Sequence, residues 1–425
     1  MSDWKEFRLG ELATVIPGYA FKGKDFGNDG CRVVKIGDIT PPIVDVANCL
    51  KIPTNKINGL DKFKLTKGDF VLAMTGATLG KVGKYSSGET GYINQRVAKF
   101  ENITGISDKR FLYYLITSNY VSNEIINRGL GSAQPNISGK DIESINVVAP
   151  NLPTQTAIAE ILSSLDDKIE LNNKINQELE NLAQTLFKRW FIDFEFPNEN
   201  GEPYKSSGGE MVDSELGEIP KGWTVEELSI ATKIIRGISY RKPELVLKGE
   251  GIPFVNLKCF SINGSFRQDG IKYFNGKYRA EHILCSNDIL VAVTDLTQDR
   301  EIIGMPILWN GSTTALPSLD TCVIRSQTQE LKNYLYYEFK TKRYKSRIIE
   351  YANGSTVLHL SVKGLDSYVF PMPTNEILKK WSSIIQPLLE TINININDKV
   401  EMSKMRDTLL PKLISGELEI NQTTN

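Results

Sequence analysis

Few residues in this 425-residue chain have the spacing of a catalytic or metal site. The stretch GATLGKVG, residues 76–83, resembles a phosphate-binding loop, but it has one residue too few between its glycines, and Val82 stands where a Ser or Thr would bind magnesium. The two histidines, His282 and His359, lie far apart in the sequence and no CxxC pair occurs, so a zinc site is not expected. No nucleophile-elbow motif accompanies the Ser and Asp residues. We therefore expect no catalytic residues and no metal ligands.

Positive charge gathers locally rather than over the whole chain. The net charge is −1 and the sequence pI is about 6.3, which gives no global sign of nucleic-acid binding. Residues 340–347, KTKRYKSR, nevertheless hold five cations in eight positions. Lys and Arg can neutralise phosphates, and Arg, Gln and Asn can also hydrogen-bond base edges. The alternative is a solvated helix face, which is the usual origin of a charge run.

Length and cysteine usage limit the class of protein. A chain of 425 residues predicts two to four structural units. Its five cysteines are odd in number and widely scattered, which favours reduced thiols and a cytoplasmic location. No apolar stretch of about 18 residues occurs, so no membrane span is expected.

The sequence contains a long internal repeat. The Trp4 and Leu9 pair recurs 219 residues later, as does GDFVLAMT at 68–75. FLYYL at 111–115 and GSAQPNIS at 131–138 recur 223 residues later, as YLYYE and GSTVLHLS. The order is kept throughout, so the pattern indicates duplication of a whole domain with its tail.

Each copy begins with strand-like runs and ends with a helical pattern. Runs such as FVLAMTG and SINVVAP are rich in β-branched and aromatic residues between turn residues, and one short helix is predicted over 108–129. The predicted fold class is α+β: two duplicated mixed α/β domains separated by an antiparallel pair of long coiled-coil helices with pseudo-twofold symmetry. The expected segments are a first domain at 1–150, a helix at 151–195, a linker at 196–222, a second domain at 223–373, a second helix at 374–418 and a tail at 419–425.

The helical segments carry heptad spacing. Ile158, Leu165, Asn172, Leu179 and Leu186 are seven residues apart, and no Pro or Gly occurs between Thr154 and Phe196. A second seam is predicted through Ile161, Lys168, Ile175 and Leu182. The residues expected at the helix or subunit interface are Leu165, Asn172, Leu179, Leu186, Phe187, Trp190, Phe191, Met402, Leu409 and Leu413.

The aromatic cluster at the end of the first helix exceeds what one partner helix needs. Phe187, Trp190, Phe191 and Phe194 follow the helical spacing i, i+3, i+4, i+7. We interpret them either as packing of the helix end onto a domain or as a docking site for another subunit.

Several stretches resemble the specificity subunit of type I restriction–modification enzymes. PNLPTQTAIAEILSSLDDKIELNNKI (150–175) is similar to the start of the family's central conserved helix, and AQTLFKRWFIDFEF (183–196) is similar to its end. LLPKLISGEL (409–418) resembles the C-terminal signature. The sequence departs from the family pattern at Thr154-Gln155, where Glu-Gln is usual, and at Leu358-His359, which replace Pro135-Asn136 of the first copy.

The resemblance implies that this chain recognises DNA and that its partner subunits carry out the chemistry. Each target-recognition domain of such a subunit reads one half of a split sequence in double-stranded DNA. Two methyltransferase subunits bind the pseudo-twofold scaffold, and motor-nuclease restriction subunits join them. S-adenosylmethionine, ATP and Mg are then expected on the partners, with no cofactor in this chain.

With this resemblance, the DNA contacts can be predicted by residue. They are Lys81, Lys84, Gln95, Arg96, Arg128, Gln134, Lys277, Arg279, Arg300, Lys342, Arg343 and Ser355. The main alternative is a non-DNA coiled-coil scaffold with two β-rich modules that bind protein or glycan. A further alternative is an enzyme, such as a nuclease, with a site that no motif reveals.

Overall fold

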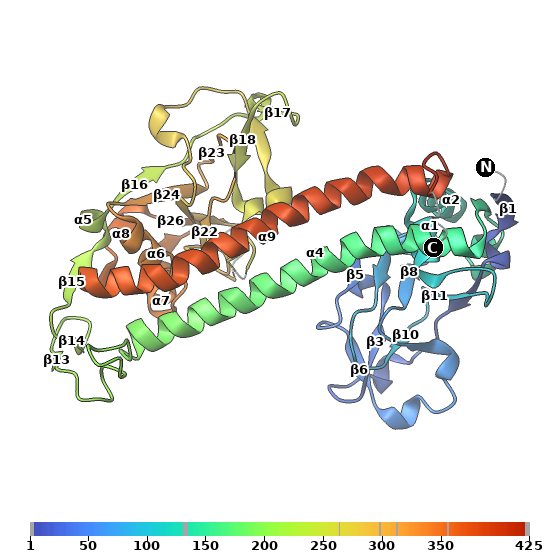
Figure 1. Cartoon of the computed structure of the whole chain (residues 1–425), viewed down its shortest axis with the longest axis horizontal. Coiled ribbons are helices and arrows are strands. Elements are labelled where there is room, and N and C mark those ends of the chain that lie inside the picture. The colour runs from blue at the N-terminus through green and yellow to red at the C-terminus, as the bar shows by residue number, and fades with distance from the viewer. Residues whose placement is uncertain are drawn as a thin grey trace. The chain divides into compact units, whose positions relative to one another are not determined.

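The computed structural model describes residues 4–130, 135–262, 264–296, 299–311, 313–354 and 357–420. The chain forms two compact units. Unit 1 comprises Met1–Asn172 and Asn397–Asn425, and unit 2 comprises Asn173–Ile396. Two long helices, α4 (Leu152–Phe187) and α9 (Asn375–Ser415), each contribute one part to each unit (Figure 1).

Unit 1 is built from three sheets and three short helices. Its main sheet has the strand order β2-β11-β8-β9-β5-β4, a second sheet has the order β6-β3-β10-β7, and β1 pairs with β12. The strands are β1 Lys5–Arg8, β2 Ala13–Pro17, β3 Cys31–Val34, β4 Ile39–Thr40, β5 Ile43–Val44, β6 Leu50–Ile52, β7 Lys64–Leu65, β8 Phe70–Ala73, β9 Val82–Lys84, β10 Gly91–Ile93, β11 Val97–Asn102 and β12 Asn146–Ala149. The helices are α1 Lys109–Thr117, α2 Asn119–Gly129 and α3 Gly139–Glu143.

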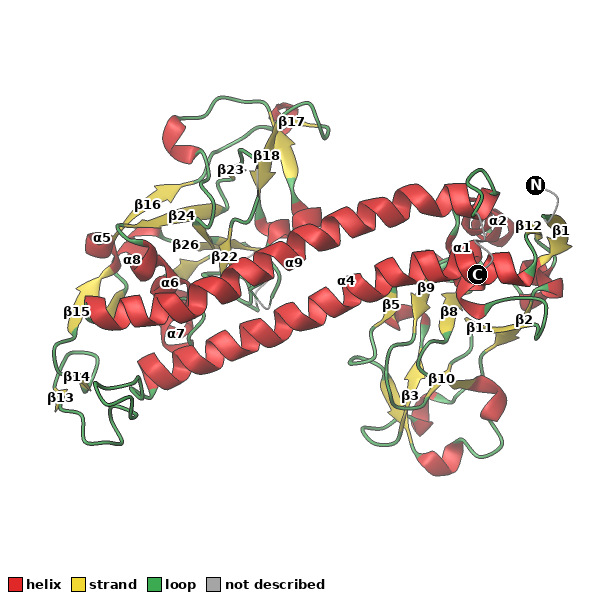
Figure 2. Cartoon of the chain, in the orientation of Figure 1, coloured by secondary structure: helices red, strands yellow, loops and turns green. Residues whose placement is uncertain are grey.

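Unit 2 also combines sheets with short helices (Figure 2), and its largest sheets have four strands where the main sheet of unit 1 has six. The orders are β16-β24-β20-β22, β17-β19-β18-β23, β21-β26-β25, β15-β27 and β13-β14. The strands are β13 Met211–Val212, β14 Ile219–Pro220, β15 Thr224–Glu227, β16 Thr232–Arg236, β17 Leu245–Val246, β18 Ile252–Val255, β19 Lys272–Phe274, β20 Ile289–Ala292, β21 Thr294–Asp295, β22 Pro306–Leu308, β23 Leu316–Pro317, β24 Thr321–Ser326, β25 Ala352–Asn353, β26 Leu358–Leu360 and β27 Val369–Met372. The helices are α5 Leu228–Ala231, α6 Gln329–Glu338, α7 Lys342–Ile349 and α8 Val362–Asp366.

The predicted single helix over 108–129 is wrong, because the segment forms two helices. Asp108 caps the first, with its carboxylate accepting from the backbone N–H groups of Arg110 and Phe111. Ser118 then takes an extended backbone with ψ 150° and caps α2. Its hydroxyl donates to the carbonyl of Leu115, which completes the end of α1 and starts α2.

The two long helices meet within each unit. In unit 1, Ile158 and Leu162 of α4 share one apolar core with Leu413 of α9. In unit 2, the Asn395 amide donates to Asn176 at 2.8 Å, and nearer the end of α4 the Phe187 ring lies 5.5 Å from that of Trp381. Higher numbers on α4 therefore meet lower numbers on α9, so these segments run antiparallel.

The prediction of a second buried row of residues on α4 is wrong by one position. Ile161 and Leu182 are 37% and 48% exposed, whereas Leu162 and Ala183 are fully buried. The buried and half-buried positions follow 158, 165, 172 and 162, 169, 176, 183, which is the alternating three and four spacing of a coiled coil. Sequence spacing alone allowed either choice, since both rows contain apolar residues.

The segment 196–222 is packed rather than loose. Phe196 is buried, and its ring stacks on Tyr204 and Trp223 with centroids 4.6 and 5.5 Å apart. β13 and β14 form a short antiparallel ladder within it. Among the described helices, none combines the length and apolar character needed to cross a membrane.

Candidate nucleic-acid interface

A tight turn joins β10 to β11 at one edge of unit 1. The backbone N–H of Gln95 donates to the carbonyl of Tyr19 at 2.8 Å, and that of Val97 to Asn94 at 3.1 Å. Gly18 lies so close to this turn that an added Cβ would stand 2.1 Å from the Asn94 carbonyl oxygen. Glycine is therefore required there. We call residues 94–97 the rim turn of unit 1.

Unit 2 has the same turn between β23 and β24. The backbone N–H of Leu319 donates to Ile238 at 2.8 Å, and that of Thr321 to Ser318 at 2.9 Å. A Cβ on Gly237 would stand 1.9 Å from the Ser318 carbonyl oxygen. Residues 318–321 are therefore the rim turn of unit 2, built by the same backbone contacts as the first.

Each rim turn lies beside one copy of a repeated segment, which is GSAQPNIS in unit 1 and GSTVLHLS in unit 2. In unit 1 the Arg96 guanidinium donates to the Asn136 amide oxygen at 3.0 Å. Asn136 also forms an isolated bridge with Thr75. In unit 2 the equivalent residue His359 pairs with Thr294, whose hydroxyl lies 3.3 Å from Nδ1 of the ring.

A cavity of about 460 Å³ opens next to the rim turn of unit 2. Leu319 of the turn lines it together with two cations, Arg236 and Lys363, and with the imidazole of His359. No Asp or Glu occurs among the described residues that line this cavity. A cationic, acid-free hollow at the edge of a sheet suits a phosphate group.

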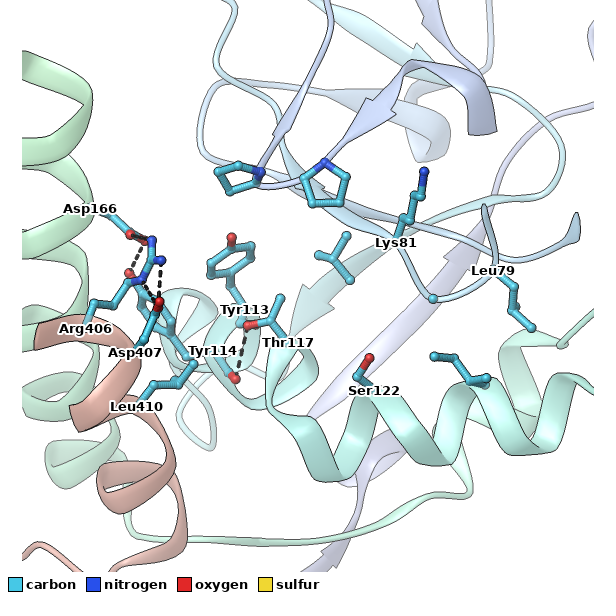
Figure 3. A pocket seen from close by; sticks show the side chains of 15 residues that line it. Leu79, Lys81, Tyr113, Tyr114, Thr117, Ser122, Asp166, Arg406, Asp407 and Leu410 are labelled. Carbon is cyan, nitrogen blue, oxygen red and sulfur yellow. Dashed lines mark hydrogen bonds and ion pairs between the residues drawn. The ribbon is translucent and has the colours of Figure 1, made fainter. Parts of the chain in front are cut away.

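A second cavity, of about 440 Å³, lies in unit 1 where α1 meets the long helices (Figure 3). One wall holds Asp166, which accepts from Lys84 at 2.8 Å, from the Tyr114 hydroxyl at 2.7 Å and from Arg406 at 2.9 Å. Burial raises the pKa of Asp166, but Lys84 and the other donors outweigh it, so this pKa lies below its ordinary value. Burial raises the pKa of Tyr113 to about 12.

Unit 2 has a comparable ion pair beside α6. Lys340 Nζ lies 2.7 Å from Glu180 of α4 and 4.2 Å from the Tyr336 ring centroid. Burial lowers the pKa of Lys340, although Glu180 opposes this shift. Both groups therefore belong to the packing of α6 against α4.

The predicted DNA contacts fall into three groups. Lys84 and Arg343 are held in internal ion pairs, Lys84 with Asp166 and Arg343 with the fully buried Glu338. Gln134 and Ser355 lie outside the described residues. The remaining predicted contacts are exposed: Lys81, Gln95, Arg96, Arg128, Lys277, Arg279, Arg300 and Lys342.

Three of the exposed arginines already have partners, among them Arg96, which donates to Asn136. Arg128 donates to the Ser144 hydroxyl at 2.6 Å and to Glu124. Arg279 pairs with Glu281 at 3.1 Å, but its side chain stays 75% exposed. Among the exposed predicted cations, Arg96 is the one that lies on a rim turn.

Half of the ten predicted interface residues are buried and the other half are partly buried. Phe187, Trp190 and Phe191 lie in the core of unit 2, against Tyr334, Trp223 and Trp381, so these three side chains pack within the chain. Asn172 and Leu413 are also buried. The half-buried members are Leu165, Leu179, Leu186, Met402 and Leu409.

Sequence reasoning missed Asn136, Arg236, His359 and Lys363. Asn136 and His359 stand at the same place in the repeat, which is a signal that the alignment of the two copies contains. Arg236 and Lys363 carried no such signal, because isolated cations gain meaning only when the fold places them around one cavity. Within the described residues, no three His, Cys, Asp or Glu side chains come together as metal ligands would.

Comparisons with known proteins identify the family. Residues 1–181 match the model of the type I restriction modification DNA specificity domain. The MjaIX specificity subunit of Methanocaldococcus jannaschii is 30% identical over 321 residues, which cover 73% of this chain and 69% of that protein. The HindI specificity subunit of Haemophilus influenzae is 23% identical over 478 residues, covering 98% and 100%.

A solved structure shares the fold. The crystal structure of the type I restriction–modification S subunit from M. genitalium superposes with a TM-score of 0.61 at 16% identity, over 97% of this chain and 96% of that one. This agrees with the duplicated arrangement of mixed α/β units and long helices described above. The chain belongs to the family of type I restriction enzyme specificity subunits.

Proposed function

We propose that this chain reads an asymmetric, bipartite sequence in double-stranded DNA and has no catalytic activity of its own. The observation that carries the proposal is the repeated rim turn, whose backbone hydrogen bonds are the same in both units while its side chains differ. Gln95 and Arg96 stand in unit 1 where Leu319 and Asp320 stand in unit 2. Two identical recognition domains would select a palindromic sequence, whereas two different recognition domains select two different half-sites.

The cations near the rim turns support contact with phosphates. Arg96 is exposed in unit 1, and Arg236 and Lys363 line the cavity of unit 2. Contacts of this kind position a protein on the duplex and make its affinity fall with salt. The overall net charge of −1 leaves room for partner subunits to supply further positive charge.

We further propose that the long helices hold two methyltransferase subunits, to which motor-nuclease subunits are added. Exposed apolar side chains on these helices support this docking role: Ile161, Leu171, Leu182, Ile384, Ile394 and Met405. Apolar side chains left in water on a helix favour a protein partner. S-adenosylmethionine, ATP and Mg would then be bound by the partners.

The DNA-reading proposal is tested by binding of random duplex DNA to the full-length chain, alone and with its co-purified methyltransferase, followed by mapping of methylated adenines. The expected result is one asymmetric motif with two defined halves and an undefined spacer. A palindromic motif contradicts the bipartite proposal. A lack of duplex binding, with and without the partner, favours the alternative scaffold that binds protein or glycan.

The docking proposal is tested with Leu182→Glu, which places a charge on the exposed side of α4. It should weaken co-purification of the methyltransferase by tenfold or more, since burying an unpaired carboxylate costs roughly 2 kcal/mol or more. Leu247→Glu is the matched control, because Leu247 is 74% exposed and lies away from the long helices. Equal co-purification of both variants contradicts the docking proposal.

A further inference from the structure

The rim turns have a fixed backbone in both units. Besides the contacts already described, the carbonyl of Arg96 accepts from the backbone N–H of Met74, and the carbonyl of Asp320 accepts from that of Val293, both at 2.8 Å. Gly18 and Gly237 donate to Val97 and Thr321. Each turn is therefore held by backbone hydrogen bonds on both sides.

The side chains on this fixed backbone differ in charge and polarity. The first turn presents Gln95 and Arg96, both exposed, and the second presents Leu319 and Asp320, both half-buried. A conserved scaffold with divergent outward side chains is how a family of readers changes specificity without changing fold. The backbone hydrogen bonds that hold the two turns are the same, so these bonds do not require the side chains to differ.

Arg96 also has a backbone conformation that is unusual for its residue type. Its φ is 70°, in the left-handed region that favours glycine. Non-glycine residues persist in that region when the surrounding structure holds them, and such residues cluster at functional sites. Here the side chain is oriented as well, because the guanidinium donates to Asn136.

We infer that the two rim turns are the base-reading elements of the chain, an inference that rests on the proposed binding of duplex DNA. Arg96 hydrogen-bonds the O6 and N7 edge of a guanine, the pairing that its planar fork favours. Asp320 accepts a hydrogen bond from an exocyclic amino group, as carboxylates do from cytosine N4. Asn136 is a positioning residue for Arg96. His359 occupies the equivalent place of the repeat in unit 2, where it lines the cavity together with Leu319.

The test is sequence selection from a random duplex library by the full-length chain with its co-purified methyltransferase. Arg96→Ala and Arg96→Lys should each lower discrimination at one base pair by roughly tenfold to a hundredfold, because neither can make two parallel hydrogen bonds to guanine. Asp320→Asn should change the preferred base in the other half-site only. The controls are Lys62→Ala and Glu199→Ala, exposed residues of unit 1 and unit 2 outside the rim turns.

A transfer experiment gives the inference a second readout. The double substitution Leu319→Gln with Asp320→Arg should introduce a guanine preference into the second half-site and leave the first unchanged. Unchanged thermal unfolding of each variant verifies that the turn has kept its fold. If the transfer variant fails to fold, the single substitutions still decide the matter.

The outcomes separate the inference from the proposed function. A wild-type complex that selects no sequence overturns the DNA-reading function. A wild-type complex that selects a sequence, with Arg96→Ala and Asp320→Asn selecting it equally well, overturns the inference alone. An equal loss of affinity for all sequences also overturns it, since that result assigns Arg96 to phosphate contact.

Discussion

The same tyrosine pair is joined to α4 by a lysine in both units, but the lysine comes from different places. In unit 1, Lys84 at the end of β9 lies over Tyr113 and pairs with Asp166. In unit 2, Lys340 just after α6 lies over Tyr336 and pairs with Glu180. The tyrosines are related by the 223-residue repeat, whereas the lysines and the acids are not.

This difference shows which part of the contact between the tyrosine pair and α4 is the same in both copies of the repeat. The aromatic faces persist because they form the core between α1 or α6 and the long helices. A lysine above a tyrosine face and beside a helix carboxylate gains both a cation–π contact and an ion pair. A lysine at any nearby backbone position can make this contact. The two units therefore make the same contact with lysines from different elements.

The two junctions also differ in burial. The side chain of Lys340 is 7% exposed and that of Glu180 is 18% exposed. Lys84 is 32% exposed, but Asp166 receives a second cation, Arg406. Unit 2 thus relies on one deeply buried pair, and unit 1 on a network around one acid.

The largest effect is expected in unit 2. Lys340→Met leaves Glu180 buried without its cation and should lower the free energy of unfolding by about 3 kcal/mol. Adding Glu180→Leu should restore most of this loss, because the stranded charge is removed. Urea unfolding of the single and double variants measures both changes, with exposed Lys342→Met as the control. A single variant as stable as wild type would show that the pair is not coupled to folding.

A smaller effect is expected from Asp166→Asn in unit 1. The amide keeps one acceptor for Tyr114 but loses the charge that holds Lys84 and Arg406, so the loss should be about 2 kcal/mol. Asp407→Asn is the matched control, because Asp407 also pairs with Arg406 but is 65% exposed and should contribute less than about 0.5 kcal/mol. Equal effects of the two variants would contradict the central role of Asp166.

The contribution of Asp166 should depend on pH. Its pKa is lower in the folded chain than its ordinary value, so the unfolded chain binds more protons and stability rises with pH through this range. The stabilisation is complete above the unfolded pKa of about 4 and is lost as pH falls through the lower, folded pKa. The difference in unfolding free energy between wild type and Asp166→Asn should therefore narrow below about pH 4. A difference that stays constant in acid would refute the ion-pair origin.

The smallest effects on stability are expected when the hydroxyls of two neighbouring tyrosines are removed one at a time. Tyr114→Phe removes the donor to Asp166 and should cost about 1 kcal/mol. Tyr113→Phe keeps the ring under Lys84 and should change stability by less than about 0.5 kcal/mol. Chemical unfolding of the two variants, made side by side, checks the order, and the reverse order would assign the network to Tyr113.

Much of the fold could be predicted from the sequence because its signals are local. The runs FVLAMTG and SINVVAP are rich in β-branched residues, and they contain β8 and β12. The long helices were identified by heptad spacing without glycine. The repeat offset of 223 residues relates the start of α4 at Leu152 to that of α9 at Asn375.

Only the tertiary structure decided which of the chemically similar candidates face the core. Ile161 and Leu162 are adjacent apolar residues that fit a heptad equally well, and the position of α9 and α1 buried Leu162 alone. The sequence does not distinguish Lys81 from Lys84, but in the structure Lys84 forms an ion pair with Asp166 and Lys81 is exposed to solvent. The sequence by itself determined the duplicated frame, because backbone preferences and apolar periods are local. Tertiary structure decided the partners of its charges, because an ion pair depends on distances of a few ångströms between residues far apart in the chain.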